Sequence, residues 1–389
     1  MFTKDSIIGV VGCGAMGSGI AQVAATAGHK TIVYDSNAAA LERARTQLEE
    51  SLAKLVGKQK ISAEKASEIS KLIVFTGALA DLKVSKLVIE AIVENIEVKQ
   101  SVFRQLESVV TEHCVLASNT SSLSITSIAS ACSRPERVLG IHFFNPATLM
   151  PLVEIIPGIA TDMVIANHCQ ALVNSFGKVT VMAKDTPGFI VNRVARPFYS
   201  EALRIYEEQL ADMATIDWAM RELGGFKMGP FELMDLIGHD VNYIVTETVW
   251  KQFYYDPRFK PSLSQKRLLE AGFLGRKSGR GFYDYREGAD QPKPLKDEAL
   301  GKYILNRILC MLINEACDTL YLGIASATDI DLAMTKGVNY PKGLLAWADE
   351  IGLAQVLVSL NALYDEYGED RYRACVKLKQ LVKQGKLFY

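Results

Sequence analysis

Residues 7–35 read IIGVVGCGAMGSGIAQVAATAGHKTIVYD, and this stretch decides the fold of the N-terminal part of the chain. An apolar, β-branched run at 7–11 predicts a buried strand, and the small residues at 20–27 predict a helix that follows it. A second apolar run at 31–34 predicts another strand. Strand, glycine-rich turn, helix and strand in this order indicate the first unit of a parallel α/β sheet.

Three glycines in the turn between the first strand and the helix have the pattern GxGxxG. Gly12 allows a tight turn, Gly14 lets the backbone approach a pyrophosphate, and Gly17 lets the helix pack close to the strand. The N-terminus of the helix offers backbone N–H groups and the positive end of its dipole to phosphates. Glycine-rich turns can also be purely structural, but the full strand–turn–helix–strand order favours a dinucleotide site. We expect the dinucleotide to contact Gly12, Gly14, Ala15, Met16 and Gly17.

An acidic residue ends the second strand of this unit. Asp35 lies 18 residues after Gly17, at the distance where a carboxylate accepts hydrogen bonds from a ribose 2′-OH. The same carboxylate would repel a 2′-phosphate, so the sequence predicts NAD rather than NADP as the cofactor.

The composition is that of a globular protein and argues against several classes of partner. The 389 residues are 49% hydrophobic and 22% charged, with a formal net charge of −1. This balance gives no electrostatic basis for binding nucleic acid or an anionic membrane, and no apolar run approaches a membrane span. The first strand begins almost at Met1, which leaves no room for a signal peptide, so we expect a cytoplasmic protein. The seven scattered cysteines form no CxxC pair and predict reduced, packed thiols, with no metal site.

Alternating strands and helices continue to about residue 185. This alternation predicts a doubly wound α/β (Rossmann) domain over 1–185, with a helical stretch at about 37–70. Beyond it the pattern is almost entirely helical. The further predicted strands lie at 72–75, 87–92, 115–118, 138–144, 152–156 and 179–182.

The helical part contains an internal repeat with an offset of 114 residues, as in Asn192 and Asn306. We therefore predict a first helical segment (186–286), a polar linker (287–298) and a second helical segment (299–389), both segments being all-α. Duplicated domains often pack as an intrachain pseudo-dimer, and a homo-oligomer is an additional prediction. The matching pairs are Val191 and Leu305, Asn192 and Asn306, Arg193 and Arg307, Glu201 and Glu315, Asp217 and Asp331, and Asp235 and Asp349.

Polar side chains follow the predicted strand at 115–118. Asn119, Ser121 and Ser122 lie where the carboxyl end of a strand borders the ligand crevice of such a sheet. They are equally compatible with capping the next helix.

A histidine and a glutamate stand in two neighbouring apolar runs. His142 lies in one predicted strand and Glu154, between Val153 and Ile155, in the next. Burying the carboxylate is costly unless it is paired, and neighbouring strands would allow the two side chains to pair. A carboxylate that fixes the imidazole tautomer makes His142 a candidate general base, whereas a purely structural pair is the alternative.

Eight motifs together resemble the L-3-hydroxyacyl-CoA dehydrogenase family, closely over residues 1–285 and also over the repeat. This resemblance implies oxidation of an L-3-hydroxyacyl-CoA to the 3-oxoacyl-CoA with NAD. The motifs are GCGAMGSGIA (12–21), LVIEAIVEN (87–95), ASNTSSL (117–123), HFFNP (142–146), LVEII (152–156), DTPGFIVNR (185–193), GPFELMDLIG (229–238) and KSGRGFYDY (277–285).

The resemblance also implies roles for individual residues. His142 is the general base, Glu154 its orienting partner, and Ser121 the donor to the substrate 3-oxygen. Asn192 helps to order His142 and the substrate. NAD is contacted by Glu94, Lys99, Asn145 and Lys277, and CoA by Ser51 and Lys58 on the helical stretch, which acts as a CoA-binding arm.

Two stretches bear on the acyl group. NRVARPFYSEA (192–202) and DLIGHDVNYIVTETV (235–249) resemble the branch that acts on 3-hydroxyadipyl-CoA in phenylacetate degradation. We expect either this substrate or 3-hydroxybutyryl-CoA of fatty-acid β-oxidation. Arg193 or Arg196 would meet a distal carboxylate, or would form helix-surface or interdomain salt bridges.

Two other functions are compatible with an NAD-binding fold. An NAD-dependent dehydrogenase of a free hydroxy acid typically relies on a lysine base, which the His142–Glu154 pair argues against. A non-catalytic NAD-binding protein need not keep Ser121, His142, Glu154 and Asn192 together.

Overall fold

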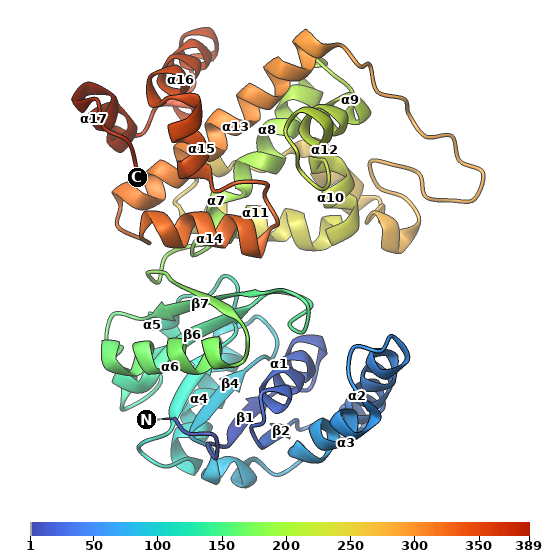
Figure 1. The fold of residues 1–389 in the computed structure, drawn as a ribbon, viewed down its shortest axis with the longest axis vertical. Helices are drawn as coiled ribbons and strands as arrows, with labels where there is room; N and C mark the ends of the chain where they lie inside the picture. The colour runs from blue at the N-terminus through green and yellow to red at the C-terminus, as the bar shows by residue number, and fades with distance from the viewer. Residues whose placement is uncertain (1) are drawn as a thin grey trace. The chain divides into compact units, whose positions relative to one another are not determined.

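The structure is a computed structural model that describes residues 2–389. It divides the chain into two compact units, Met1–Thr186 and Pro187–Tyr389 (Figure 1). Among the described residues, no helix combines the length and the apolar character that crossing a membrane requires.

The first unit contains one eight-stranded sheet with the order β3-β2-β1-β4-β5-β6-β7-β8. All neighbouring strands are parallel except β6 and β7, which pair antiparallel. Every strand predicted from the sequence is present, with its ends within two residues of the prediction. The strands are β1 (Ile8–Val11), β2 (Thr31–Tyr34), β3 (Ile73–Thr76), β4 (Leu87–Glu90), β5 (Val115–Ser118), β6 (Val138–Phe143), β7 (Leu152–Pro157) and β8 (Val179–Met182).

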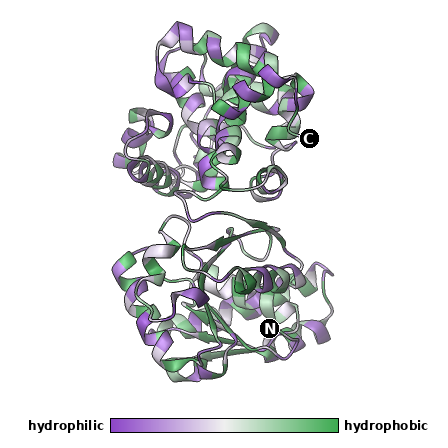
Figure 2. Ribbon diagram, turned by 90° about the vertical axis from the view of Figure 1, so that its left-hand side faces the viewer, coloured by the Kyte–Doolittle hydropathy of each residue, from purple (hydrophilic) through white to green (hydrophobic). Residues whose placement is uncertain are grey.

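Both faces of the sheet are covered, which makes the unit a doubly wound Rossmann-like domain. Successive strand residues point to opposite faces, so Val10 belongs to one apolar core and Val11 to the other. Ile20 of α1 (Ala15–Thr26) packs into the first core, and Phe103 of α4 (Ile96–Val109) packs into the second. Figure 2 shows the strands coloured as hydrophobic, as expected for strands buried on both faces. Two further helices of this unit are α5 (Ile125–Ala129) and α6 (Met163–Ser175).

The helical stretch predicted at 37–70 consists of two helices, α2 (Ala38–Gly57) and α3 (Ala63–Leu72), which lie side by side (Figure 1). The chain leaves the helical conformation at Gln59, whose φ is +55°. It re-enters at Ser62, whose side chain accepts a hydrogen bond from the backbone N–H of Lys65. A periodicity argument missed this break because the apolar spacing continues on both sides of it.

The second unit is helical. Its longest helix, α13 (Glu298–Tyr321), packs against α8 (Arg196–Glu207), and residues 289–297 before it contain neither helix nor strand. The remaining α-helices are α7 (Val191–Val194), α9 (Met213–Trp218), α10 (Pro230–Ile237), α11 (His239–Gln252), α12 (Leu263–Glu270), α14 (Ala327–Gly337), α15 (Leu344–Ile351), α16 (Leu353–Tyr367) and α17 (Val376–Gln384).

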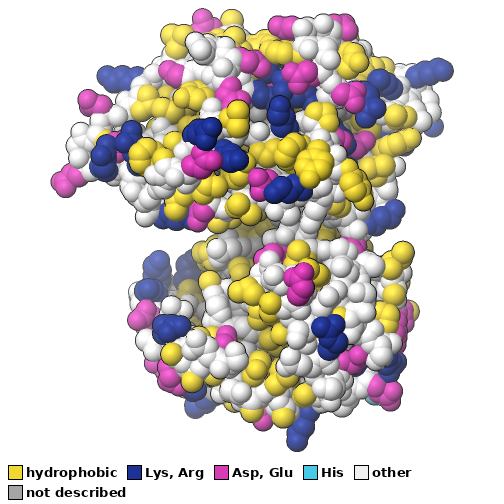
Figure 3. Space-filling model, turned by 180° about the vertical axis from the view of Figure 1, so that it is seen from behind, with side chains coloured by type: hydrophobic (Ala, Val, Ile, Leu, Met, Phe, Trp, Pro, Cys, Tyr) yellow, Lys and Arg dark blue, Asp and Glu magenta, His cyan; other side chains and the backbone are white. Residues whose placement is uncertain are grey.

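The surface carries charges of both signs. On the face drawn in Figure 3, basic and acidic side chains are interspersed over each unit, in keeping with the net charge of −1. All seven cysteines are free and buried, as the sequence predicted.

Candidate active site

The glycine-rich turn between β1 and α1 has no room for a side chain at Gly12 or Gly17. Gly12 has a φ of +94°, and a Cβ on it would lie 2.7 Å from the carbonyl oxygen of Ala91. A Cβ on Gly17 would lie 1.8 Å from the carbonyl oxygen of Gly12, whereas Gly14 faces open space. No described side chain caps the N-terminus of α1. This open backbone at a helix N-terminus fits a pyrophosphate.

Asp35 lies directly after β2, where a ribose would be recognised. Its Oδ2 accepts a hydrogen bond from the backbone N–H of Cys13 at 3.0 Å, and its Oδ1 accepts one from Asn37 at 2.9 Å. Burial raises the pKa of this carboxyl, but the two backbone hydrogen bonds outweigh it and hold the pKa below its usual value. An ionised acceptor held in this way fits the ribose of NAD.

His142 and Glu154 face each other across the antiparallel pair of β6 and β7. The two are directly opposite in register, both side chains are buried, and His142 Nδ1 lies 2.7 Å from Glu154 Oε2. Because a carboxylate only accepts, Nδ1 must donate, which makes Nε2 the proton-accepting nitrogen of the neutral ring. The pairing of the two side chains that the sequence predicted is therefore present.

Glu94 holds the loop that follows β5. Its Oε1 accepts hydrogen bonds from the backbone N–H groups of Ser121 at 3.1 Å and Ser122 at 3.2 Å, and from the Thr120 hydroxyl. Burial raises the pKa of Glu94, but the Lys99 ammonium and these hydrogen bonds lower it below its usual value. Glu94 is thus an anchor for Ser121 as well as a predicted NAD contact.

Lys99, a predicted NAD contact, is only 1% exposed. The sequence did not predict that this lysine would be buried. Its Nζ lies 2.6 Å from Glu90 Oε1 and 3.4 Å from Glu94 Oε2. Glu90 Oε2 in turn accepts a hydrogen bond from the Ser118 hydroxyl at 2.7 Å. Glu90 was not predicted as a site residue, although a carboxylate at the end of the apolar run LVIE is the same signal that singled out Glu154.

Asn119 connects the loop after β5 to the strand that carries His142. Its Oδ1 accepts a hydrogen bond from the backbone N–H of Phe143 at 2.8 Å. The alternative that Asn119, Ser121 and Ser122 cap the next helix is wrong, because the N-cap of α5 is Ser124. Asn145 is exposed in the turn between β6 and β7.

A groove of about 640 Å³ runs along the helical arm of the first unit. It is lined by Ser51 and Lys58, the two predicted CoA contacts, and by Lys54. The Ser51 hydroxyl donates to Gln22 Oε1 at 3.2 Å.

Four of the singled-out residues, Asn192, Arg193, Arg196 and Lys277, belong to the second unit. Asn192 lies in α7, and Lys277 lies in a 3-10 turn with its Nζ 2.5 Å from Asp240 Oδ1. Arg193 is buried, and its Nε donates to Glu315 Oε1 at 2.6 Å, which is the salt-bridge alternative of the sequence analysis.

Comparison with known proteins agrees with the motifs and with this geometry. The profile of the 3-hydroxyacyl-CoA dehydrogenase NAD-binding domain matches residues 7–186, and that of the C-terminal domain of the same family matches residues 188–285 and 303–388. The chain is 39% identical to 3-hydroxyadipyl-CoA dehydrogenase of Escherichia coli K12, over 98% of both chains. It is 41% identical to the mitochondrial hydroxyacyl-coenzyme A dehydrogenase of Sus scrofa, over 71% of this chain and 90% of the pig protein.

The crystal structure of 3-hydroxybutyryl-CoA dehydrogenase from Escherichia coli K12 superimposes with a TM-score of 0.92 at 37% identity, covering 98% of this chain and 99% of that one. The chain belongs to the 3-hydroxyacyl-CoA dehydrogenase family of NAD-dependent oxidoreductases.

Proposed function

We propose that the chain oxidises an L-3-hydroxyacyl-CoA to the 3-oxoacyl-CoA with His142 as general base. The observation that carries this proposal is the 2.7 Å hydrogen bond between His142 Nδ1 and Glu154 Oε2. With Nδ1 donating to Glu154, Nε2 takes the proton of the 3-hydroxyl group, and the carboxylate stabilises the imidazolium that forms. NAD, when bound, supplies the oxidant.

Two further side chains contact the substrate in this proposal. The hydroxyl of Ser121 donates to the substrate 3-oxygen, and Asn192 orients the substrate and His142. The hydrogen bonds from the loop after β5 to Glu94 support the role of Ser121, because they fix the backbone that carries its side chain. A positioned donor of this kind lowers the barrier only if its support is rigid.

The CoA moiety is assigned to the groove along the arm. Lys58 and Lys54 place two cations there, which suits the phosphates of CoA, and the Ser51 hydroxyl offers a hydrogen bond. The acyl group is that of 3-hydroxyadipyl-CoA or 3-hydroxybutyryl-CoA, the substrates that name the two Escherichia coli relatives.

The test compares two buried histidines of the first unit. His142→Gln should lower kcat by about 10²–10⁴-fold, the usual cost of losing a general base, and leave the Kd of NAD nearly unchanged. His29, whose Nδ1 lies 2.9 Å from the carbonyl oxygen of Ser6, is the matched control. His29→Gln should keep kcat within about threefold. A near-normal kcat in His142→Gln, measured with 3-hydroxybutyryl-CoA and 3-hydroxyadipyl-CoA, would refute the assignment.

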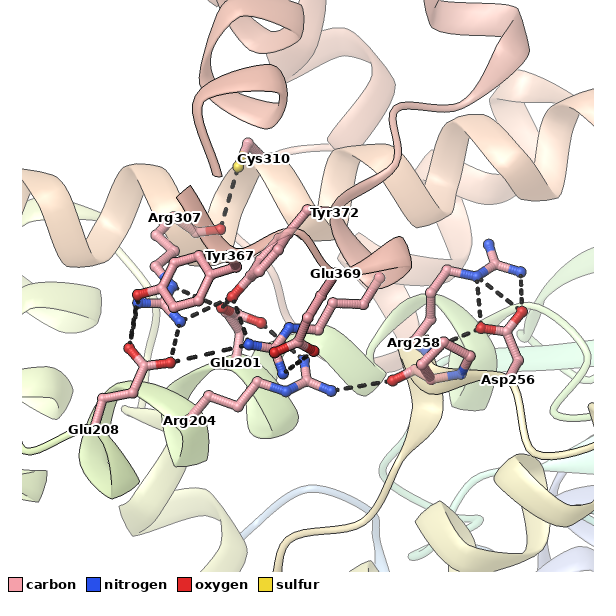
Figure 4. A network of polar contacts seen from close by, with 12 residues as sticks. Glu201, Arg204, Glu208, Asp256, Arg258, Arg307, Cys310, Tyr367, Glu369 and Tyr372 are labelled. Atoms are coloured by element: carbon pink, nitrogen blue, oxygen red, sulfur yellow. Dashed lines mark hydrogen bonds and ion pairs between the residues drawn. The ribbon is translucent and has the colours of Figure 1, made fainter. Parts of the chain in front are cut away.

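We also infer that the first and second helical segments are copies of one unit, packed as a pseudo-dimer within the chain. Arg193 Nε donates to Glu315 Oε1 at 2.6 Å. Arg307 Nε donates to Glu201 Oε1 at 2.7 Å, and Figure 4 shows this second pair. Since Arg307 and Glu315 lie 114 residues after Arg193 and Glu201, exchanging the copies maps one ion pair onto the other. Reciprocal contacts of this kind are the property of a twofold interface.

Helix caps inside the two segments also support the repeat. Asp217 accepts a hydrogen bond from the backbone N–H of Phe231 at the start of α10, at 2.9 Å. Asp331 accepts one from Leu345 at the start of α15, also at 2.9 Å. Both pairs have the 114-residue offset. The cytoplasmic location and a homo-oligomer remain predictions from the sequence.

A further inference from the structure

Arg196, the first residue of α8, is a buried cation without an acidic partner. It is 5% exposed, and its guanidinium stacks on the ring of Tyr199 at 4.9 Å. Nη1 donates to the hydroxyl of Thr246 at 3.1 Å, whereas Nε has no hydrogen-bond partner among the described residues. The only ionisable groups within electrostatic reach of it in the described chain are the hydroxyls of Tyr199 and Tyr340.

An arginine three residues earlier shows what this chain does with a structural cation. Arg193, buried like Arg196, donates to the carboxylates of Glu315 and Asp318 at 2.6 and 2.8 Å. Burying a guanidinium is costly unless an anion and hydrogen bonds satisfy it. Arg193 has both an anion and hydrogen bonds, whereas Arg196 has a hydrogen bond to the neutral Thr246 hydroxyl and no anion in the described part of the chain.

The second helical segment shows that helix packing does not require a polar pair here. The residues 114 positions after Arg196 and Thr246 are Cys310 and Leu360, and both are buried. Cys310 Sγ donates to the carbonyl oxygen of Arg307 in its own helix (Figure 4). The same two places are thus filled by small and apolar side chains in one segment and by a guanidinium and a hydroxyl in the other.

The donors around Arg196 match a carboxylate. The hydroxyl of Tyr340, like Nε of Arg196, is buried without a hydrogen-bond partner among the described residues. Buried donors of this kind are satisfied by an acceptor that carries negative charge, and the planar guanidinium binds a carboxylate in two-point geometry. Burial also lowers the pKa of Arg196, which an incoming anion would reverse.

We propose that Arg196 binds the distal carboxylate of the acyl group, so that the substrate is an L-3-hydroxydicarboxyl-CoA. The inference rests on the proposed function, in which Asn192 contacts the substrate. Asn192 and Arg196 are four residues apart in the helical run 191–207, with Ala195 between α7 and α8 also in the right-handed helical conformation. Side chains four residues apart lie on the same face of a helix.

The experiment measures kcat/KM for L-3-hydroxyadipyl-CoA and L-3-hydroxyhexanoyl-CoA, which share a six-carbon chain and differ only in the terminal carboxylate. The wild-type protein should prefer the adipyl substrate. In Arg196→Met this preference should fall by about 100-fold or more, the usual effect of removing one partner of a buried charge pair. Thr246→Leu, which copies Leu360, should reduce the preference in the same direction by a smaller factor.

Thermal unfolding separates binding from a structural role. If Arg196 binds a ligand, Arg196→Met should leave Tm unchanged or raise it, because the substitution removes a buried, unpaired charge. The equivalent position of the second segment is occupied by the neutral Cys310. A fall in Tm together with an unchanged substrate preference would overturn the inference. An equal preference for both substrates in the wild-type protein would also overturn it and would leave the proposed function intact, whereas no turnover of either substrate would refute the proposed function itself.

Discussion

In the proposed repeat, the two helical segments have equivalent ion pairs and helix caps but differ at most other positions, and this contrast separates what folds the protein from what it does. The ion pairs of Arg193 and Arg307 and the helix caps of Asp217 and Asp331 recur with the same partners in both segments. They belong to the fold. Arg196 has no charged equivalent in the second segment, where Cys310 takes its place.

The asparagines at the start of each segment differ in their surroundings. Asn306 Nδ2 donates to the hydroxyl of Ser359 at 3.2 Å, so the second segment occupies its amide internally. The residue 114 positions before Ser359 is Val245, so the hydrogen bond between Asn306 and Ser359 has no counterpart between the equivalent residues of the first segment. Asn306 thus takes part in the packing of the second segment, whereas the proposed function assigns Asn192 to the substrate.

The largest effect should come from removing the second segment. Ending the chain after residue 290 would uncover the face of α8 that packs on α13, and Glu201, fully buried, would lose Arg307 and Tyr372. We expect the truncated chain to dimerise or aggregate, because large exposed apolar faces associate with one another. Sedimentation velocity measures the outcome. A stable, soluble monomer would contradict the internal pseudo-dimer.

Breaking either reciprocal ion pair should cost the same stability. Glu201→Gln and Glu315→Gln each remove one of the two carboxylates that pair with a buried guanidinium, since Arg307 keeps Glu208 and Arg193 keeps Asp318. We expect each variant to lower the free energy of unfolding by up to about 3–5 kcal/mol. Denaturant unfolding should give values that agree within about 1 kcal/mol for the two variants. The exposed Glu298, paired with Lys302, is the control, and Glu298→Gln should leave the free energy of unfolding unchanged. A large difference between the two buried variants would show that the interface is not twofold.

The paired asparagines should differ in activity. Asn192→Ala should lower kcat/KM by about 100-fold, because a substrate displaced by about 1 Å reacts that much more slowly. Asn306→Ala should leave kcat/KM within about twofold and lower stability slightly through the lost hydrogen bond to Ser359. Equal losses of activity in the two variants would mean that the second segment takes part in the reaction.

A smaller effect concerns the stability of the protein at acidic pH. Burial raises the pKa of Glu201, but Arg204, Arg307 and Arg371 outweigh it and lower the pKa to about 2. A folded-state pKa below the unfolded one gives stability that is complete above about pH 4.5 and is lost as the pH falls toward 2. The difference in free energy of unfolding between wild type and Glu201→Gln should therefore shrink below about pH 4.5. A constant difference down to the acid transition would show that Glu201 is already protonated in the folded protein.

Local patterns predicted the strands of the sheet and the pairing of His142 with Glu154, because the signals lie within short segments. The strands follow apolar runs, and Glu154 stood out as a carboxylate flanked by Val153 and Ile155. The antiparallel pairing of β6 and β7, which sets His142 directly opposite Glu154, was not predicted, since strand direction depends on the connection between the strands.

The features that the sequence did not predict depend on pairs of residues that are not recognisable as partners from the sequence. Lys99 is buried because Glu90 and Glu94 neutralise it, and its sequence position on an amphipathic helix gave no sign of this. Arg193 and Glu315 are 122 residues apart, and no local pattern indicates that they meet. The sequence could name both Arg193 and Arg196 as candidates, but only their surroundings distinguish a paired cation from an unpaired one.

The seven buried thiols provide built-in reporters of opening. Burial raises the pKa of Cys13, Cys132 and Cys375 to about 11, so almost no reactive thiolate is present at neutral pH while the chain is folded. Four cysteines lie in the first unit and three in the second helical segment, and the first helical segment has none. Alkylation followed by peptide mass spectrometry would therefore record, without any engineered label, whether the second segment detaches before the Rossmann unit opens.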